Sequence, residues 1–351
     1  MRNPLVIRGK KAQKPIIQGG MGIGISLDRL AGAVAKEGGV GTISAANPGY
    51  GEADFEQNPQ AANTRALSRQ IGSAKEKSEG NGLIAVNIMV AMRHYDEMVA
   101  CCVEHGADVI VSGAGLPLDL PKLTGDSDVA IAPIVSSLRS VQVLLKRWDR
   151  NYHRTADLVI IEGPKAGGHL GFSVEEIERY RTEDYEVEIG RILELIRGEY
   201  EPKYGQHIPV VFGGGVFTRE DVDHVLSLGC DGVQMATRFV VTEECDADIR
   251  YKEAYLAAEE ESVQLVESPV GMPGRAIANS FLQTVKGSFQ QVKQCFGCLR
   301  TCTPQHTPYC ISRALMEAAR GRVEDALLFC GETVSRLKEL TTVRALMEEL
   351  G

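Results

Sequence analysis

The sequence predicts an α/β fold, namely a (β/α)8 TIM barrel with a helical C-terminal cap. Two observations predict it: short apolar runs alternate eight times with segments of helical periodicity, and this alternation ends near residue 245. A length of 351 residues also suits one large α/β domain with an appendage. We therefore expect a barrel over residues 1–245 and a helical cap over residues 246–351.

The expected strands are short and rich in β-branched residues, as buried parallel strands are. We place them at residues 15–18, 40–44, 83–88, 108–112, 129–134, 157–162, 208–212 and 232–235. Eight such units in succession are the number that closes a TIM barrel.

The segments between the strands carry the signals of amphipathic helices. Ser26 is expected to cap a helix that Gly38 ends, and Thr218 with Asp221 resembles a capping box. Between the fifth and sixth strands, an apolar stripe is formed by Leu138, Val141, Leu145 and Trp148. These stripes are interpreted as the faces that pack against the sheet.

Two segments exceed a minimal barrel. Residues 51–80 are polar and rich in Ala, Gln, Glu and Lys, which predicts a long solvent-facing helix or a lid. Residues 173–206 are strongly acidic, contain several tyrosines and follow His169 closely. This second segment is expected either to cover the site or to form a solvated face.

Composition excludes several classes of protein. The net charge of −9 argues against nucleic acid as the main partner, and no apolar run is long enough for a membrane span. The first residues lack the apolar core of a secretory signal, so we expect a cytoplasmic location. In that compartment the nine cysteines are not expected to form structural disulfides.

The most informative stretch runs from residue 157 to residue 171. It is a predicted strand that ends at Glu162, and Gly167, Gly168 and His169 follow in a glycine-rich exit. The carboxyl ends of barrel strands are where such enzymes keep their chemistry, so Glu162 and His169 are candidate site residues. The alternative is a tight turn that ends in a surface histidine.

Other predicted strands have similar exits, which place small or polar residues at one end of the barrel. They are Gln18-Gly19-Gly20-Met21-Gly22, Asn87, Ser112-Gly113-Ala114-Gly115, Ser136-Ser137, Gly213-Gly214-Gly215 and Ala236-Thr237-Arg238-Phe239. Glycine here leaves room for a large planar ligand, and the loops after strands seven and eight are the commonest phosphate site in this fold. The pattern predicts a phosphorylated cofactor; the alternative is that the glycines only make tight turns.

Together these motifs resemble one known family. Pro15 to Gly22, Val86-Asn87-Ile88-Met89, Glu162-Gly163, Ala166-Gly167-Gly168-His169, Gly214-Gly215 and Gln234 to Phe239 are similar to the nitronate monooxygenase (2-nitropropane dioxygenase) family. That family is shared with FMN-dependent enoyl-ACP reductases. The resemblance covers roughly residues 12–280 in the same order.

The resemblance implies an FMN at the C-terminal mouth of the barrel. Gln18, Gly19, Gly20 and Met21 would lie along the isoalloxazine, and Asn87 and Glu162 would bond the ring or ribityl chain. Gly214, Gly215, Ala236 and Thr237 would hold the phosphate, with Gly167 and Gly168 as a shelf beside the flavin. His169 matches the family's catalytic histidine.

The chain also departs from the family pattern. Ala236 replaces the usual glycine, and Ser136 and Ser137 stand where related enzymes often have a lysine. The segment from Val270 to Ala276 looks closer to the enoyl reductase branch.

A cysteine cluster in the cap lies outside the family pattern. Its spacing is Cys295-x2-Cys298-x3-Cys302-x7-Cys310, with Cys330 as a possible substitute ligand. Thiolates at such spacing bind iron–sulfur clusters or zinc, and we favour a [4Fe–4S] cluster because structural zinc usually takes two well-separated pairs. The alternative is a set of reduced cysteines packed in a small cap.

Three functions are consistent with these features. The first is a nitronate monooxygenase that oxidises alkyl nitronates with O2 through reduced FMN. The second is an NAD(P)H-dependent reductase of enoyl-ACP or other enoyl thioesters, and the third is a non-catalytic flavin-binding subunit of a larger complex. The expected partner is a small molecule or an acyl thioester, with neither nucleic acid nor membrane, and a homodimer is one assembly that the sequence allows.

Overall fold

The computed structural model describes residues 2–181, 183–287 and 290–351. Eight parallel strands close into a barrel in the order β3-β4-β5-β6-β7-β8-β10-β11, with β11 paired back to β3. They are β3 (Ile16–Gln18), β4 (Val40–Ser44), β5 (Leu83–Met89), β6 (Val109–Gly113), β7 (Ala130–Val135), β8 (Val159–Glu162), β10 (Val210–Gly213) and β11 (Gly232–Met235). The TIM barrel and its eight strands are therefore confirmed.

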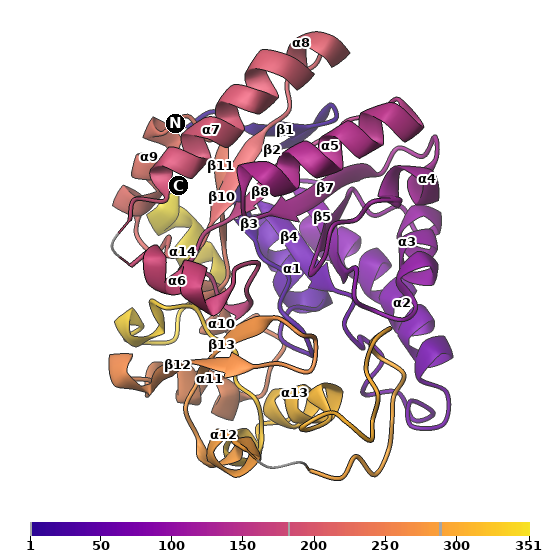
Figure 1. The fold of residues 1–351 in the computed structure, drawn as a ribbon, viewed down its shortest axis with the longest axis vertical. Coiled ribbons are helices and arrows are strands. Elements are labelled where there is room, and N and C mark those ends of the chain that lie inside the picture. Colours follow the sequence, from indigo (N-terminus) through magenta and orange to yellow (C-terminus); the bar gives the residue numbers. More distant parts are fainter. Residues whose placement is uncertain (1, 182, 288–289) are drawn as a thin grey trace.

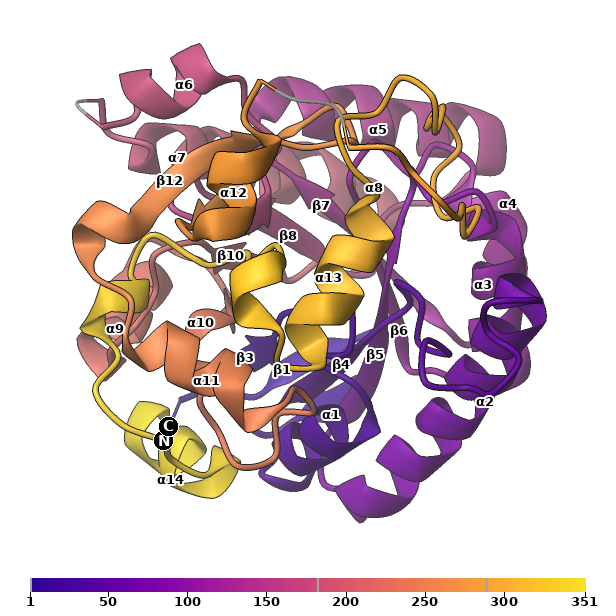
Figure 2. The same cartoon turned by 90° about the horizontal axis from the view of Figure 1, so that it is seen from below.

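Helices surround the barrel, as Figure 2 shows. They are α1 (Asp28–Lys36), α2 (Pro59–Ser78), α3 (Tyr95–Glu104), α4 (Leu120–Thr124), α5 (Leu138–Tyr152), α7 (Glu186–Leu195), α9 (Arg219–Ser227) and α10 (Thr237–Val240). Capping boxes begin α5 at Ser137 and α9 at Thr218, the latter as expected. The expected cap of α1 differs, because the Ser26 hydroxyl accepts from the Met21 amide while the carboxylate of Asp246 accepts from Leu27 and Leu30.

Both long excursions contribute helices to the barrel wall. In α2 one face is buried, including Ala66, Leu67 and Ile71, so this helix packs on the barrel and is not wholly solvent-facing. After β8 the chain forms the short α6 (Val174–Arg179), then α7, which continues through η1 (Ile196–Tyr200) and α8 (Glu201–Tyr204). The charge-rich segment therefore contains an amphipathic helix, α7, whose buried positions are few but regularly spaced.

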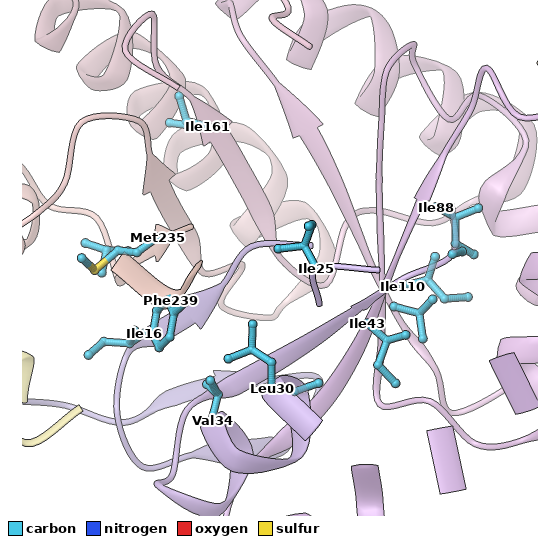
Figure 3. Packing of buried hydrophobic residues seen from close by; sticks show 14 of the residues in the cluster. Ile16, Ile25, Leu30, Val34, Ile43, Ile88, Ile110, Ile161, Met235 and Phe239 are labelled. Atoms are coloured by element: carbon cyan, nitrogen blue, oxygen red, sulfur yellow. The ribbon is translucent and has the colours of Figure 1, made fainter. Parts of the chain in front are cut away.

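Two apolar layers support the strands. Strand side chains that point outward, such as Ile16, meet side chains of the helices, such as Leu30, Val34 and Phe239 (Figure 3). The inward-pointing side chains fill the barrel. At the N-terminal end this inner core includes Leu5 and Ile7 of a hairpin formed by β1 (Leu5–Ile7) and β2 (Lys10–Ala12). With the inner core packed at this end, the opposite end is left for a ligand.

The C-terminal part covers that opposite end (Figures 1 and 2). Its helices are α11 (Ile249–Leu256), α12 (Ser280–Val285), α13 (Ile311–Ala319) and α14 (Val343–Leu350), with short turns η2 (Glu260–Ser262), η3 (Val323–Asp325) and η4 (Val334–Arg336). Besides these helices it contains a hairpin, β12 (Val263–Glu267) and β13 (Pro273–Ile277), which pairs with β9 (Gly168–His169).

The last helix, α14, packs against α1, and the Arg2 guanidinium donates to the carbonyl of Leu350, so the two ends of the chain lie close together. No helix within the described ranges has the length and apolarity needed to cross a membrane.

Candidate active site

A cavity of about 460 Å³ opens at the carboxyl ends of the barrel strands. Twelve of the thirteen catalytic and cofactor-binding residues predicted from sequence line it: Gly19, Gly20, Met21, Asn87, Glu162, Gly167, Gly168, His169, Gly214, Gly215, Ala236 and Thr237. The strands thus bring together exits that are more than 200 residues apart in the chain.

Gln18 is the exception. Its side chain is completely buried, and its Oε1 accepts a hydrogen bond from the amide of Thr42 at 2.9 Å. As the last residue of β3, Gln18 projects toward the neighbouring strand and does not line the cavity. Gln18 therefore does not face the cavity in which a flavin would bind, and its side chain joins β3 to β4.

Three glycines shape the cavity wall, either by allowing a close backbone contact or by adopting a positive φ angle. A Cβ on Gly167 would lie 2.5 Å from the backbone carbonyl of Cys330, so no other residue fits between the two segments. Gly214 and Gly215 have φ angles of +120° and +88°, which L side chains rarely adopt. In the described part of the chain no acceptor is found for the amides of Gly214, Gly215 or Thr237, which leaves these donors for a ligand.

His169 is held by the C-terminal hairpin. It pairs with Gly274 of β13, and the next amide, that of Leu170, donates to the carbonyl of Pro273 at 2.8 Å. Its Nε2 lies 2.7 Å from the hydroxyl of Ser268, and its ring contacts the ring of Phe329 edge-on at 4.8 Å. Burial lowers the pKa of His169 to about 4, so the imidazole is neutral at pH 7.

Glu162 is the second titratable group in the cavity wall. Its carboxylate accepts from the amide of Gly171 at 2.6 Å, and the Ser136 hydroxyl donates to the carbonyl of Gly171, also at 2.6 Å. Desolvation raises the pKa of Glu162 to about 7, although the Gly171 amide and the charge of Arg275 pull it down. The carboxyl is thus poised to change charge near neutral pH, and it fixes the end of the glycine-rich exit.

Arg275, which the sequence did not single out, clamps the start of the same exit. Its side chain is 5% exposed, and it donates to the carbonyls of Pro164, at 3.0 Å, and of Ala166. Glu332 is its ion-pair partner at 3.6 Å. Burial lowers the pKa of Arg275, but the guanidinium stays charged at any pH a protein survives.

The C-terminal chain supplies a wall of the cavity that the sequence did not predict. Phe329, Cys330, Gly331 and Thr333 all line it. The Cys330 amide donates to the carbonyl of Arg275 at 3.0 Å, and the Glu332 amide donates to the carbonyl of Lys165 at 3.3 Å. These residues come from a segment without a recognisable motif, so only the long-range contacts reveal them.

The cysteine cluster is not arranged as a metal site. Cys295 is exposed, Cys298, Cys302 and Cys310 are partly buried, and Cys330 lies apart in the cavity wall. Nowhere in the described ranges do three or more His, Cys, Asp or Glu side chains converge as metal ligands would. The geometry therefore does not support the expected [4Fe–4S] cluster or zinc.

The physical reason is that the segment has an apolar core of its own. Leu299 and Tyr309 are buried with Phe281 and Ile311, and Phe296 stacks on Phe55 at 5.4 Å. Residues 296–309 include few apolar side chains, and several of the partners that bury them lie on distant parts of the chain. Burial raises the pKa of Cys298 to about 11, as for a thiol that stays protonated.

Comparisons with known proteins agree with this fold. The family model described as nitronate monooxygenase matches residues 3–351. A nitronate monooxygenase of Pseudomonas aeruginosa is 27% identical over 294 residues, which cover 76% of this chain and 77% of that protein. Among solved structures, FabK from Thermotoga maritima has a TM-score of 0.71 at 22% identity and covers 96% of this chain and 91% of its own. A nitroalkane oxidase from Streptomyces ansochromogenes also has a TM-score of 0.71, at 19% identity, with 96% and 94% coverage.

Proposed function

Because the chain belongs to the nitronate monooxygenase family, we propose that it is an FMN-dependent oxidoreductase that oxidises alkyl nitronates. The observation that carries the proposal is a neutral histidine, His169, fixed at the edge of a glycine-lined cavity. Each part of the cavity can be assigned a task in this chemistry.

The residues present fit a flavin mononucleotide. The cavity volume lies within the range of about 300–1,000 Å³ that is usual for small-molecule and cofactor sites. Gly167 and Gly168 offer a surface without side chains, and the amides of Gly214, Gly215 and Thr237 are donors suited to a phosphate. When bound, the flavin would supply the electron transfer, which no amino-acid side chain here can provide.

Hydrogen-bond accounting supports a donor role for His169. The Ser268 hydroxyl accepts from the amide of Val270 at 3.3 Å, and its own proton can be donated to Nε2 of His169, which lies 2.7 Å away. If Ser268 donates to Nε2, the hydrogen of the neutral ring must be on Nδ1. In that tautomer the Nδ1–H, for which no partner is found in the described part of the chain, is free for a ligand.

A nitronate suits such a donor, because the two oxygens of its anionic nitro group accept hydrogen bonds. Its alkyl chain would find apolar surface in the same cavity, from Met21, Met89, Leu116, Met272 and Leu315. The proposal therefore favours a nitronate with an apolar chain. It also argues against a purely non-catalytic subunit, since strongly shifted pKa values of Glu162 and His169 in one cavity are typical of active sites.

The test is turnover of the FMN-loaded protein in air with ethyl nitronate, followed by nitrite release. The proposal predicts nitrite at a rate well above that of free FMN, without any pyridine nucleotide. Absence of nitrite with ethyl nitronate and with propionate-3-nitronate would refute it.

A second candidate is the reduction of an enoyl thioester, and one feature favours it. The chain contains no Asp or Glu between Glu267 and Glu317, although its net charge is −9. Within that stretch Lys286, Lys293 and Arg313 are exposed, so the cap would attract the phosphates of an acyl carrier. Two results together would establish this candidate in place of the first: NADH or NADPH is oxidised only when crotonyl-CoA is present, and no nitrite is released from a nitronate.

A further inference from the structure

The predicted phosphate site consists of neutral groups only. Gly214, Gly215, Ala236 and Thr237 offer amides and one hydroxyl, none of which carries a full charge. A phosphate monoester such as that of FMN is largely dianionic above its second pKa of about 6. Neutral donors alone would leave this charge uncompensated.

Lys165 is the one lysine or arginine among the described residues that line the cavity. Its stem lies over Gly215, where an added Cβ would approach the Cδ of Lys165 to 3.1 Å. Its side chain is exposed, and no carboxylate within the described ranges forms an ion pair with its Nζ. The sequence did not single it out, because it precedes the glycine motif.

The backbone of Lys165 is fixed although its side chain is free. Arg275 donates to the carbonyls of Pro164 and Ala166 on either side of it, and the Glu332 amide donates to the carbonyl of Lys165 itself. Three of the contacts that shape this turn therefore come from the C-terminal part of the chain. An ordered backbone with an unpaired cation beside free amides is the arrangement expected of a preorganised anion site.

We propose that Lys165 binds the phosphate of the cofactor and makes the site selective for FMN over the unphosphorylated riboflavin. The inference rests on the proposed function, because it assumes that the phosphate lies against Gly214, Gly215 and Thr237. It assigns the lysine a binding role and no part in the chemistry at His169.

The experiment measures the affinity of cofactor-free protein for FMN and for riboflavin, each from quenching of flavin fluorescence. Lys165→Met removes the charge but keeps an unbranched stem, and Lys165→Arg keeps the charge. Lys146→Met is the matched control, because Lys146 is an exposed lysine of α5 that does not line the cavity. Titrations at low and high salt test whether the effect is electrostatic.

We expect Lys165→Met to weaken FMN binding roughly 10- to 100-fold, which is typical of losing a charged hydrogen bond to phosphate. Riboflavin affinity should be unchanged, Lys165→Arg should retain most FMN affinity, and the salt dependence should be smaller in Lys165→Met. Unchanged FMN affinity in Lys165→Met, or equal losses for FMN and riboflavin, would overturn the inference alone. If the wild-type protein bound neither flavin, the proposed function would fail first.

Discussion

Glu162→Gln should remove a pH-dependent loss of folding stability that arises because the Glu162 carboxyl is desolvated in the cavity wall. The side chain keeps its shape, and the amide oxygen of Gln can still accept from Gly171. The carboxyl titrates near its ordinary pKa of 4.5 when the chain is unfolded and near about 7 when it is folded. Between these values the folded chain holds more protons, so its stability falls as the pH rises.

The size of the effect follows from the two pKa values. At pH 5 the unfolded carboxyl has already lost most of its proton, whereas the folded carboxyl keeps it, and at pH 8 both states are largely ionised. Linkage then gives a loss of about 2–3 kcal/mol between pH 5 and pH 8 in cofactor-free wild-type protein. Other groups, including His169, titrate in this range, so the difference between wild type and variant is the quantity to use.

Urea unfolding at pH 5 and pH 8 measures this difference. Glu162→Gln should lack the loss, and Glu220→Gln, which changes an exposed glutamate of α9, should behave as wild type does. If Glu162→Gln and wild type lost the same stability on going to pH 8, then Glu162 would not be desolvated, and the description of the cavity wall would be wrong.

Three further predictions concern the residues around the cavity. Ser268→Ala should lower kcat by roughly 10- to 100-fold with little change in KM, because Ser268 no longer fixes the tautomer and orientation of His169. Ser268→Thr keeps the hydroxyl and should restore most of the rate. Equal losses of kcat in both variants would argue against a role of Ser268 in positioning His169. Arg275→Met should reduce the free energy of unfolding by about 2–4 kcal/mol in urea titrations, because two buried carbonyls lose their donor. The control, Arg250→Met, removes an arginine that pairs with Asp248 at the surface and should change the free energy of unfolding little. The Cys298→Ser, Cys302→Ser double variant should bind FMN with wild-type affinity, because neither thiol lines the cavity, and weaker fluorescence quenching would contradict this.

The barrel could be predicted because its signals are local. Each strand is an apolar run with a polar or glycine-rich exit, and eight such runs admit few other arrangements. Twelve predicted residues reached the cavity for the same reason, since parallel strands bring their carboxyl ends together. Gln18 does not line the cavity, because the direction of its side chain depends on the register of the barrel, which the glycines after it do not reveal.

The unpredicted parts depend on contacts between distant segments. Ser268 is 99 residues from His169, and Arg275 is more than 100 residues from the carbonyls it clamps. Ser268 belongs to no recognised motif, and Arg275 lies in the segment from Val270 to Ala276, whose resemblance to the enoyl reductase branch assigns this residue no contact. For the cysteine cluster, in contrast, the local spacing predicted a metal site that the structure does not support. Burial of Leu299 and Tyr309 against other segments provides the packing that a metal would have supplied.

The most direct test mixes FMN-loaded protein with ethyl nitronate without oxygen and follows the loss of flavin absorbance by stopped flow. Wild type should bleach, whereas His169→Ala should keep its FMN and bleach roughly 10²- to 10⁴-fold more slowly, the usual contribution of a positioned proton donor or acceptor. Equal rates of bleaching in the two proteins would contradict the role of His169. No bleaching in wild type would contradict nitronate oxidation itself.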